Sequence, residues 1–223
     1  MHAIEPVHAT TKQFGPVAQN GHWQASACHA VQTPPMRFAR NAEIYGEGEP
    51  AEFIYQVVSG SVRVFSILND GRRQIGAFHL PGDYFGFEAG DFHAMSAEAV
   101  TETKVRVVQR SSSLAASDAD AGLSRELWSA TVRELQNARK HLVLLVRRAE
   151  ERVASFLLEM AERAKSPEID LPMSRQDIAD YLGLTIETVS RTLTHLEEAG
   201  AISLRSARRI LLEDKRKLQH LNS

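Results

Sequence analysis

The residues with the clearest chemistry lie in the segment 185–196, where polar side chains recur at a helical spacing. Glu187 and Arg191 are four residues apart, so both lie on one face of an α-helix. In the DNA major groove, guanine offers two acceptors to an arginine and cytosine offers an amino donor to a carboxylate. Ser190 adds a hydroxyl beside Arg191. These side chains predict a base-reading surface; the alternative for Glu187 and Arg191 alone is a surface ion pair along the helix.

Two short helices joined by a glycine are expected to position this face. Ser174 and Asp177 have the spacing of a capping box at the start of the first helix. Gly183 follows its last turn, where glycine readily adopts the left-handed conformation that ends a helix. The second helix is expected to begin at Thr185 and to end at Gly200, with its apolar residues facing inward. This pattern is typical of a helix–turn–helix, and it favours base readout over the ion pair.

A hairpin is expected after the second helix, with strands at 202–204 and 209–212 around a basic turn, as in the wing of a winged helix. Polar and basic residues at the helix starts and in this turn suit contacts to DNA phosphates, which set register rather than sequence choice. The candidate phosphate-binding residues are Ser174, Arg175, Gln176, Thr185, Thr188, Arg205 and Arg208.

A long amphipathic helix is expected over residues 122–149, because apolar residues repeat there every seven positions. Such a seam is typical of a coiled-coil dimer, and the alternative is a helix that packs on its own barrel. The expected dimer-interface residues are Trp128, Val132, Leu135, Ala138, Leu142, Leu145 and Ala149. A further helix should run to Ala164, where Ser166 and Pro167 stop it, with a hinge near Arg148 between the two.

Short alternating runs with turn residues between them occupy the segment 43–108 and predict a β-roll or barrel. An Asp-Gly pair at residues 70–71 predicts a hairpin turn, since glycine takes the positive φ that such turns require. The expected strands include residues 53–58, 62–65, 73–80 and 104–107.

Composition limits the remaining possibilities. The 223 residues are 43% hydrophobic with a net charge of −2, which suits a folded protein with a local DNA-reading head rather than one coated in nucleic acid. The single cysteine, Cys28, excludes an intrachain disulfide and any site built from several cysteines. No secretory signal or membrane-spanning run is seen, so we expect a cytoplasmic protein. The expected parts are a flexible tail (1–36), a β-roll (37–121), a dimerisation helix (122–149) and a winged helix–turn–helix (150–223).

From Arg37 to Leu212 the chain resembles the CRP/FNR family of bacterial transcription regulators. The motif Glu187-x-x-Ser190-Arg191 resembles the FNR-type recognition helix, and the segments 45–52 and 70–83 resemble the FixK branch. This resemblance implies an α+β fold: an N-terminal cyclic-nucleotide-binding-like β-roll (jelly roll), a long dimerisation helix and a C-terminal winged helix–turn–helix.

The resemblance also implies a function. It implies a homodimer that binds double-stranded DNA at a palindrome of the TTGAT–four bases–ATCAA kind and works with RNA polymerase. Arg191 would read the guanine, Glu187 the opposing cytosine and Ser190 the thymine region. The expected role is to activate genes for microaerobic respiration or nitrogen fixation.

Departures from the wider family argue against a bound cofactor or metal. An iron–sulfur cluster needs several thiolates, and this chain has one cysteine. Gly86-Phe87-Glu88 keeps a trace of the cyclic-nucleotide motif, but Met95 stands where the phosphate-binding arginine belongs. Haem or effector gating, with His79 or His93 as the candidate haem ligands, and a non-DNA cyclic-nucleotide signalling module are the alternatives. No catalytic motif stands out, so we expect a protein that is not an enzyme.

Overall fold

The structure is a computed structural model that describes residues 34–110 and 121–221. Cys28 and nearly all of the predicted tail lie outside these ranges. The last tail residue, Met36, belongs instead to the first strand. None of the described helices is long and apolar enough to cross a membrane.

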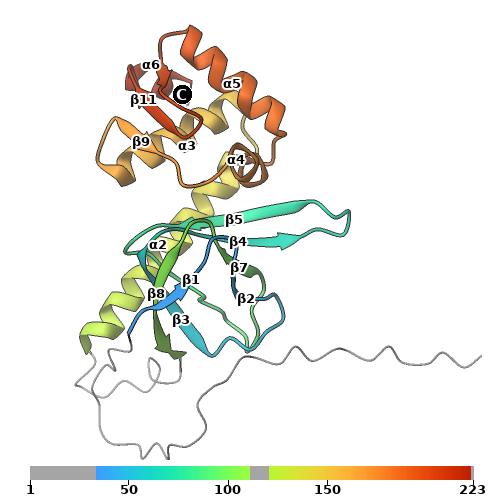
Figure 1. Cartoon of the computed structure of the whole chain (residues 1–223), viewed down its shortest axis with the longest axis vertical. Coiled ribbons are helices and arrows are strands. Elements are labelled where there is room, and N and C mark those ends of the chain that lie inside the picture. Colours follow the sequence, from blue (N-terminus) through green and yellow to red (C-terminus); the bar gives the residue numbers. More distant parts are fainter. Residues whose placement is uncertain (1–33, 111–120, 222–223) are drawn as a thin grey trace, which may run out of the picture. The chain divides into compact units, whose positions relative to one another are not determined.

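The first part is a roll of two antiparallel sheets (Figure 1). Each sheet has four strands, in the orders β1-β8-β3-β6 and β2-β7-β4-β5. Its core contains the buried residues Val57, Val62, Phe85, Ala97 and Val105, one from each of five strands. The strands are β1 (Met36–Phe38), β2 (Glu43–Tyr45), β3 (Phe53–Ser59), β4 (Val62–Ile67), β5 (Arg73–His79), β6 (Tyr84–Phe85), β7 (Ser96–Ala99) and β8 (Thr103–Gln109). The β-roll prediction is therefore confirmed.

The predicted hairpin between β4 and β5 is also confirmed. Gly71 has φ +82°, and the Leu68 N–H donates to the Arg72 carbonyl oxygen at 2.8 Å. This hairpin lies against the C-terminal part of the chain, because β5 packs on the first helix of the helix–turn–helix.

Two helices follow, α2 (Ala121–Leu144) and α3 (Ala149–Ala164). The expectation of one helix running to Ala149 is wrong, because α2 ends at Leu144 and a turn fills residues 145–148. Arg152 holds this turn by donating to the carbonyl oxygens of Arg147 and Leu182, each at 2.8 Å. The break expected near Arg148 is confirmed, since Arg148 has the extended conformation that precedes α3.

The C-terminal part is a winged helix–turn–helix with a three-stranded sheet, β10-β11-β9. Its elements are β9 (Glu168–Asp170), α4 (Arg175–Leu182), α5 (Ile186–Glu198), β10 (Ile202–Leu204), β11 (Arg209–Leu212) and α6 (Lys215–His220). The two helices, the left-handed Gly183 between them and the wing hairpin were predicted; β9 and α6 were not. Ile75 and Phe78 of β5 join the apolar core of this part, so its orientation is fixed by side-chain packing.

Candidate nucleic-acid interface

The second helix of the helix–turn–helix, α5, has the buried and exposed faces that its sequence predicts. Val189, Leu193 and Leu196 are buried, while Glu187 and Arg191 are exposed. Thr185 caps the helix by accepting a hydrogen bond from the Thr188 N–H at 3.2 Å. The apolar face anchors the helix and leaves its polar face open to a partner.

Glu187 and Arg191 do not pair with each other. In the described part of the chain, no guanidinium nitrogen of Arg191 lies within 4.0 Å of a carboxylate oxygen of Glu187. A hydrogen bond from its own backbone N–H, a further one from Thr185 and the charge of Arg191 hold the pKa of Glu187 below its ordinary value. Glu187 is therefore an anionic acceptor and Arg191 an exposed donor, as major-groove readout of a C·G pair requires.

The start of α4 carries three of the predicted phosphate-binding residues, and each already has a hydrogen bond within the protein. Ser174 forms the predicted capping box: its Oγ accepts from the Asp177 N–H at 3.1 Å, and its own N–H donates to Oδ2 of Asp177 at 2.9 Å. The Gln176 amide donates to Asp180 at 2.7 Å. Half-buried Arg175 donates from Nη1 to Oγ of Ser190, at 3.3 Å, rather than pointing freely to solvent.

The other predicted phosphate-binding residues lie at the start of α5 and in the wing. The hydroxyls of Thr185 and Thr188 are 3.1 Å apart. Arg205 is exposed at one side of the wing turn, with Nη2 3.7 Å from Oε1 of Glu213, and Arg208 lies on the other side of that turn. Among these four residues, the two threonines contact each other at the start of α5, and the two arginines lie in the wing.

A buried ion-pair network fixes α4 to the β-roll, and nothing in the local sequence marked it. Oδ1 of Asp177 lies 3.1 Å from Nη1 of Arg63 and 2.6 Å from Nη2 of Arg73. Arg73 also donates to Asp180 at 2.8 Å, and Arg63 lies 2.6 Å from Glu98. Burial alone would raise the pKa of Asp177, but hydrogen bonds from Ser174 and the two arginine charges hold it below its ordinary value. Asp177 is therefore an ionised anchor as well as a helix cap.

The β-roll contains a cavity of about 210 Å³, in the region where Gly86-Phe87-Glu88 and Met95 were singled out. Its charged lining groups are the carboxylates of Glu88 and Glu134, and no arginine or lysine lines it. Met95 covers β5 so closely that a Cβ placed at Gly76 would lie 3.0 Å from its Cε atom. The cavity thus offers no cation to a cyclic phosphate, and it is smaller than the ~300–1,000 Å³ typical of small-molecule pockets.

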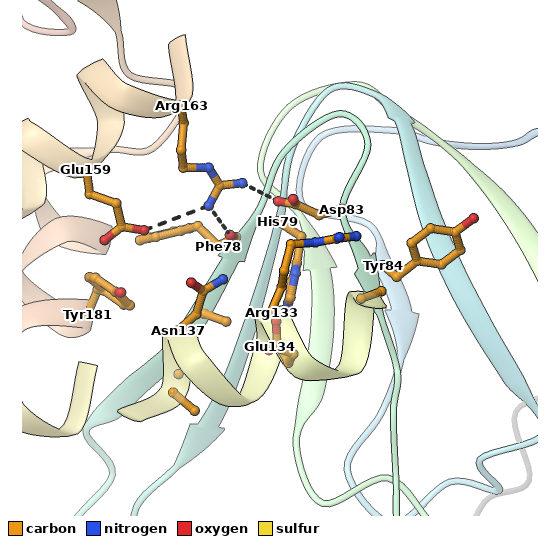
Figure 2. Close-up of a pocket in the computed structure, with 14 residues that line it drawn as sticks. Phe78, His79, Asp83, Tyr84, Arg133, Glu134, Asn137, Glu159, Arg163 and Tyr181 are labelled. Atoms are coloured by element: carbon orange, nitrogen blue, oxygen red, sulfur yellow. Dashed lines mark hydrogen bonds and ion pairs between the residues drawn. The ribbon is translucent and has the colours of Figure 1, made fainter. Parts of the chain in front are cut away.

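A second cavity, of about 80 Å³, lies between β5, α2 and α3 (Figure 2). Arg163 of α3 reaches across it to the Asp83 carboxylate and to the carbonyl oxygen of Phe78, and Glu159 lies 4.0 Å from the same guanidinium (Figure 2). His79 lines both cavities and is buried, and burial lowers its pKa to about 4. Arg163 therefore pairs across the joint between α3 and the β-roll, while Glu159 pairs with Arg163 along α3 itself.

The other candidate haem ligand, His93, is enclosed by side chains. Its ring stacks on Tyr45 with centroids 3.6 Å apart, and Nδ1 lies 3.5 Å from Oε1 of Glu88. Neither ring nitrogen has a hydrogen-bond partner, and burial lowers the pKa of His93. This geometry gives the ring a packing role in the roll.

Comparison with known proteins agrees with this architecture. Residues 35–119 match the cyclic nucleotide-binding domain family, and residues 151–221 match the Crp-like helix-turn-helix domain family. The chain is 51% identical over 216 residues to the nitrogen fixation regulation protein FixK of Azorhizobium caulinodans, which covers 94% of this chain and 87% of that protein. It is 48% identical over 170 residues to FixK of Rhizobium meliloti, over 75% and 77% of the two chains.

A solved structure of a FixK protein has the same fold as this chain. FixK2 from Bradyrhizobium japonicum superimposes with a TM-score of 0.80 at 51% identity, covering 86% of this chain and 98% of that one. The β-roll, the winged helix and the open face of α5 define a DNA-binding transcription regulator with a Crp-like helix–turn–helix. Within that class, the chain belongs to the FixK proteins of the CRP/FNR family. This membership confirms the predicted fold and family, and it identifies the chain as a regulator rather than an enzyme.

Proposed function

We propose that the chain acts as a homodimer in the cytoplasm, binds a TTGAT–four bases–ATCAA palindrome, and activates genes for microaerobic respiration or nitrogen fixation together with RNA polymerase. The observation that carries this proposal is that Glu187 and Arg191 are exposed on α5 and form no ion pair with each other. Arg191 donates to guanine O6 and N7, and Glu187 accepts from the N4 amino group of the opposing cytosine. Ser190 contacts the neighbouring thymine. The relatives named as nitrogen fixation regulators support the choice of target genes.

The second copy is expected to pack on the apolar seam of α2. Trp128, Leu135 and Leu142, each seven residues apart, are 70%, 51% and 69% exposed in one chain. Val132 and Ala138 flank this seam. An exposed apolar stripe at this spacing suits a coiled coil between two copies, which places two α5 helices on one palindrome.

The other two predicted interface residues lie beyond α2. Leu145 is in the turn at 145–148, with its Cδ2 3.5 Å from a Cβ placed at Gly183, and Ala149 is the first residue of α3. We assign them to the joint with the helix–turn–helix rather than to the seam. We therefore propose three parts for this region of the chain: a β-roll at 37–121, a dimerisation helix that ends at Leu144, and a winged helix–turn–helix at 150–223.

We assign to the DNA-backbone contacts that set register the residues that border α5 or form the wing, namely Ser174, Gln176, Thr185, Thr188, Arg205 and Arg208. The seventh candidate, Arg175, also borders α5, but its guanidinium donates to Ser190 within the protein, so we do not count it among these contacts. DNA binding is expected without a bound cofactor. The anionic β-roll cavity and Met95 disfavour a cyclic nucleotide, and the Asp177 ion pairs connect α4 to the β-roll directly through protein side chains.

The test is a binding titration in air, with the purified full chain and a palindromic duplex but no added ligand. Wild type should bind, and Arg191→Ala should lose about 1–3 kcal/mol of discrimination at the guanine pair. Strict dependence on cAMP, haem or anaerobic conditions would support the gated alternative. Failure to bind any palindromic duplex under all of these conditions would overturn the proposal in favour of a signalling module.

A further inference from the structure

Arg175 contacts the recognition helix, and this contact has a consequence for base choice. Its Nη1 atom lies 3.3 Å from Oγ of Ser190, although the two residues belong to different helices. Its Nε–H is fully buried and has no hydrogen-bond partner, so the inner edge of the guanidinium faces the protein. A side chain held in this way is poorly placed to act only as a mobile phosphate contact.

We infer that Arg175 is a positioning residue that makes Ser190 a hydrogen-bond donor toward the DNA, an inference that rests on the proposed function. A serine hydroxyl has one hydrogen to donate and two lone pairs that can accept. Arginine can only donate, so one lone pair of Ser190 is engaged by Arg175. The remaining O–H is polarised by this charge-assisted bond and is directed to an acceptor.

This arrangement separates thymine from cytosine at the pair that Ser190 faces. Thymine presents the O4 acceptor at the position where cytosine presents its N4 amino donor. A donating hydroxyl bonds to O4, whereas the cytosine amino group finds only the second lone pair of Ser190 Oγ, whose oxygen already accepts from Arg175, and it lies near the guanidinium charge. Without Arg175, the Ser190 hydroxyl rotates freely and can accept from cytosine, so the discrimination narrows.

The experiment uses the full chain and a set of palindromic duplexes. In each duplex, one T·A pair is replaced by C·G at the same position of both half-sites. At the pair facing Ser190, wild type should prefer T·A by about tenfold, the value of one hydrogen bond to a charged network. Arg175→Ala should narrow this preference to about threefold or less with an unchanged salt slope. Ser190→Ala should narrow it equally, and the double variant should add nothing, because the two side chains act as one unit.

Arg205→Ala provides the matched control, because this exposed wing arginine suits a phosphate. It should weaken binding to every duplex alike and lower the salt slope by about 0.9. Arg175→Met keeps the apolar stem and is measured in place of Arg175→Ala if that variant unfolds.

The outcomes distinguish a failure of the proposed function from a failure of the positioning role of Arg175. A wild type that binds no palindrome overturns the proposed function itself. A wild type that binds and reads guanine, with an Arg175 variant that behaves like Arg205→Ala, makes Arg175 a phosphate contact and overturns the positioning role. An Arg175 variant that keeps the full preference for T·A overturns it as well.

Discussion

Nη2 of Arg73, in β5, lies 2.6 Å from Oδ1 of Asp177, in the first turn of α4. Asp177 is 4% exposed, and it also caps α4 through Ser174. One carboxylate therefore both starts the first helix of the helix–turn–helix and attaches that helix to the β-roll. Because α5 packs on α4, it inherits this fixed position. This arrangement supports the proposal that α5 binds DNA without an effector.

Replacing Asp177 should test this anchor. Asp177→Asn leaves the charges of Arg63 and Arg73 without their shared buried partner, a loss that typically costs about 3–5 kcal/mol. Urea unfolding at pH 7 measures the loss. Asp180→Asn is the control, since it weakens a second partner of Arg73 and an exposed bond from Gln176 but leaves Asp177 intact, and it should cost about 1 kcal/mol. Equal unfolding free energies for the two variants would argue against a special role for Asp177.

The seam of α2 predicts a dimer that one charge can disrupt. Leu135→Glu places a carboxylate in the centre of the apolar stripe, where a second copy would bury it, so the protein should become monomeric. Gln136→Glu adds the same charge one residue along the helix, about 100° around its axis, and should remain dimeric. Sedimentation equilibrium at micromolar concentration distinguishes the two. A dimer that survives Leu135→Glu would place the interface elsewhere.

The main elements were predictable because their signals are local. Periodicity identified α5 and its buried face, Gly183 marked the joint, and Asp70-Gly71 marked a hairpin. The strands β1, β2, β6, β7 and β9 have two to four residues each, too few to establish an alternating pattern. Such strands form because longer neighbours offer them hydrogen bonds.

Two features of the site could not be predicted, because they depend on distant contacts. Asp177 pairs with arginines 104 and 114 residues away, and its local sequence showed only a helix cap. The seven-residue repeat continues through Leu145, but this residue is apolar because it packs near Gly183, not because α2 continues. An apolar repeat in the sequence indicates that these residues are buried, but it does not identify the part of the protein that buries them.

The β-roll cavity predicts that cyclic nucleotides have no effect on DNA binding. The carboxylates of Glu88 and Glu134 line the cavity, and Met95 occupies the place of the expected cation, so a cyclic phosphate would be desolvated without compensation. Adding millimolar cAMP should change the affinity for the palindrome by less than about twofold, since no differential binding means no population shift. The purified protein should also lack the visible absorption of haem. Activation by cAMP, or a haem band, would refute this prediction.

Buried histidines predict a loss of stability in mild acid. Burial lowers the pKa of His79 to about 4, although the negative charge of Asp83 acts to raise it; an exposed histidine has a pKa of 6.5. Between pH 6.5 and about 4 the unfolded chain therefore binds a proton that the folded chain does not. The free energy of unfolding should fall by about 1.4 kcal/mol per pH unit across this window from His79 alone, or about 3 kcal/mol in total. His93 and His141, whose pKa values burial also lowers, act in the same direction.

Urea unfolding at pH 6.5, 5.5 and 4.5 measures this slope. His79→Gln removes one of the titrating groups, so its stability should fall less steeply with acid than that of wild type, even if the variant is less stable at pH 6.5. His220→Gln removes a histidine at an exposed position of α6 and serves as the surface control. If His79→Gln and wild type lose stability in parallel, the imidazole of His79 is not held neutral in the folded protein, and the acid response must come from other groups.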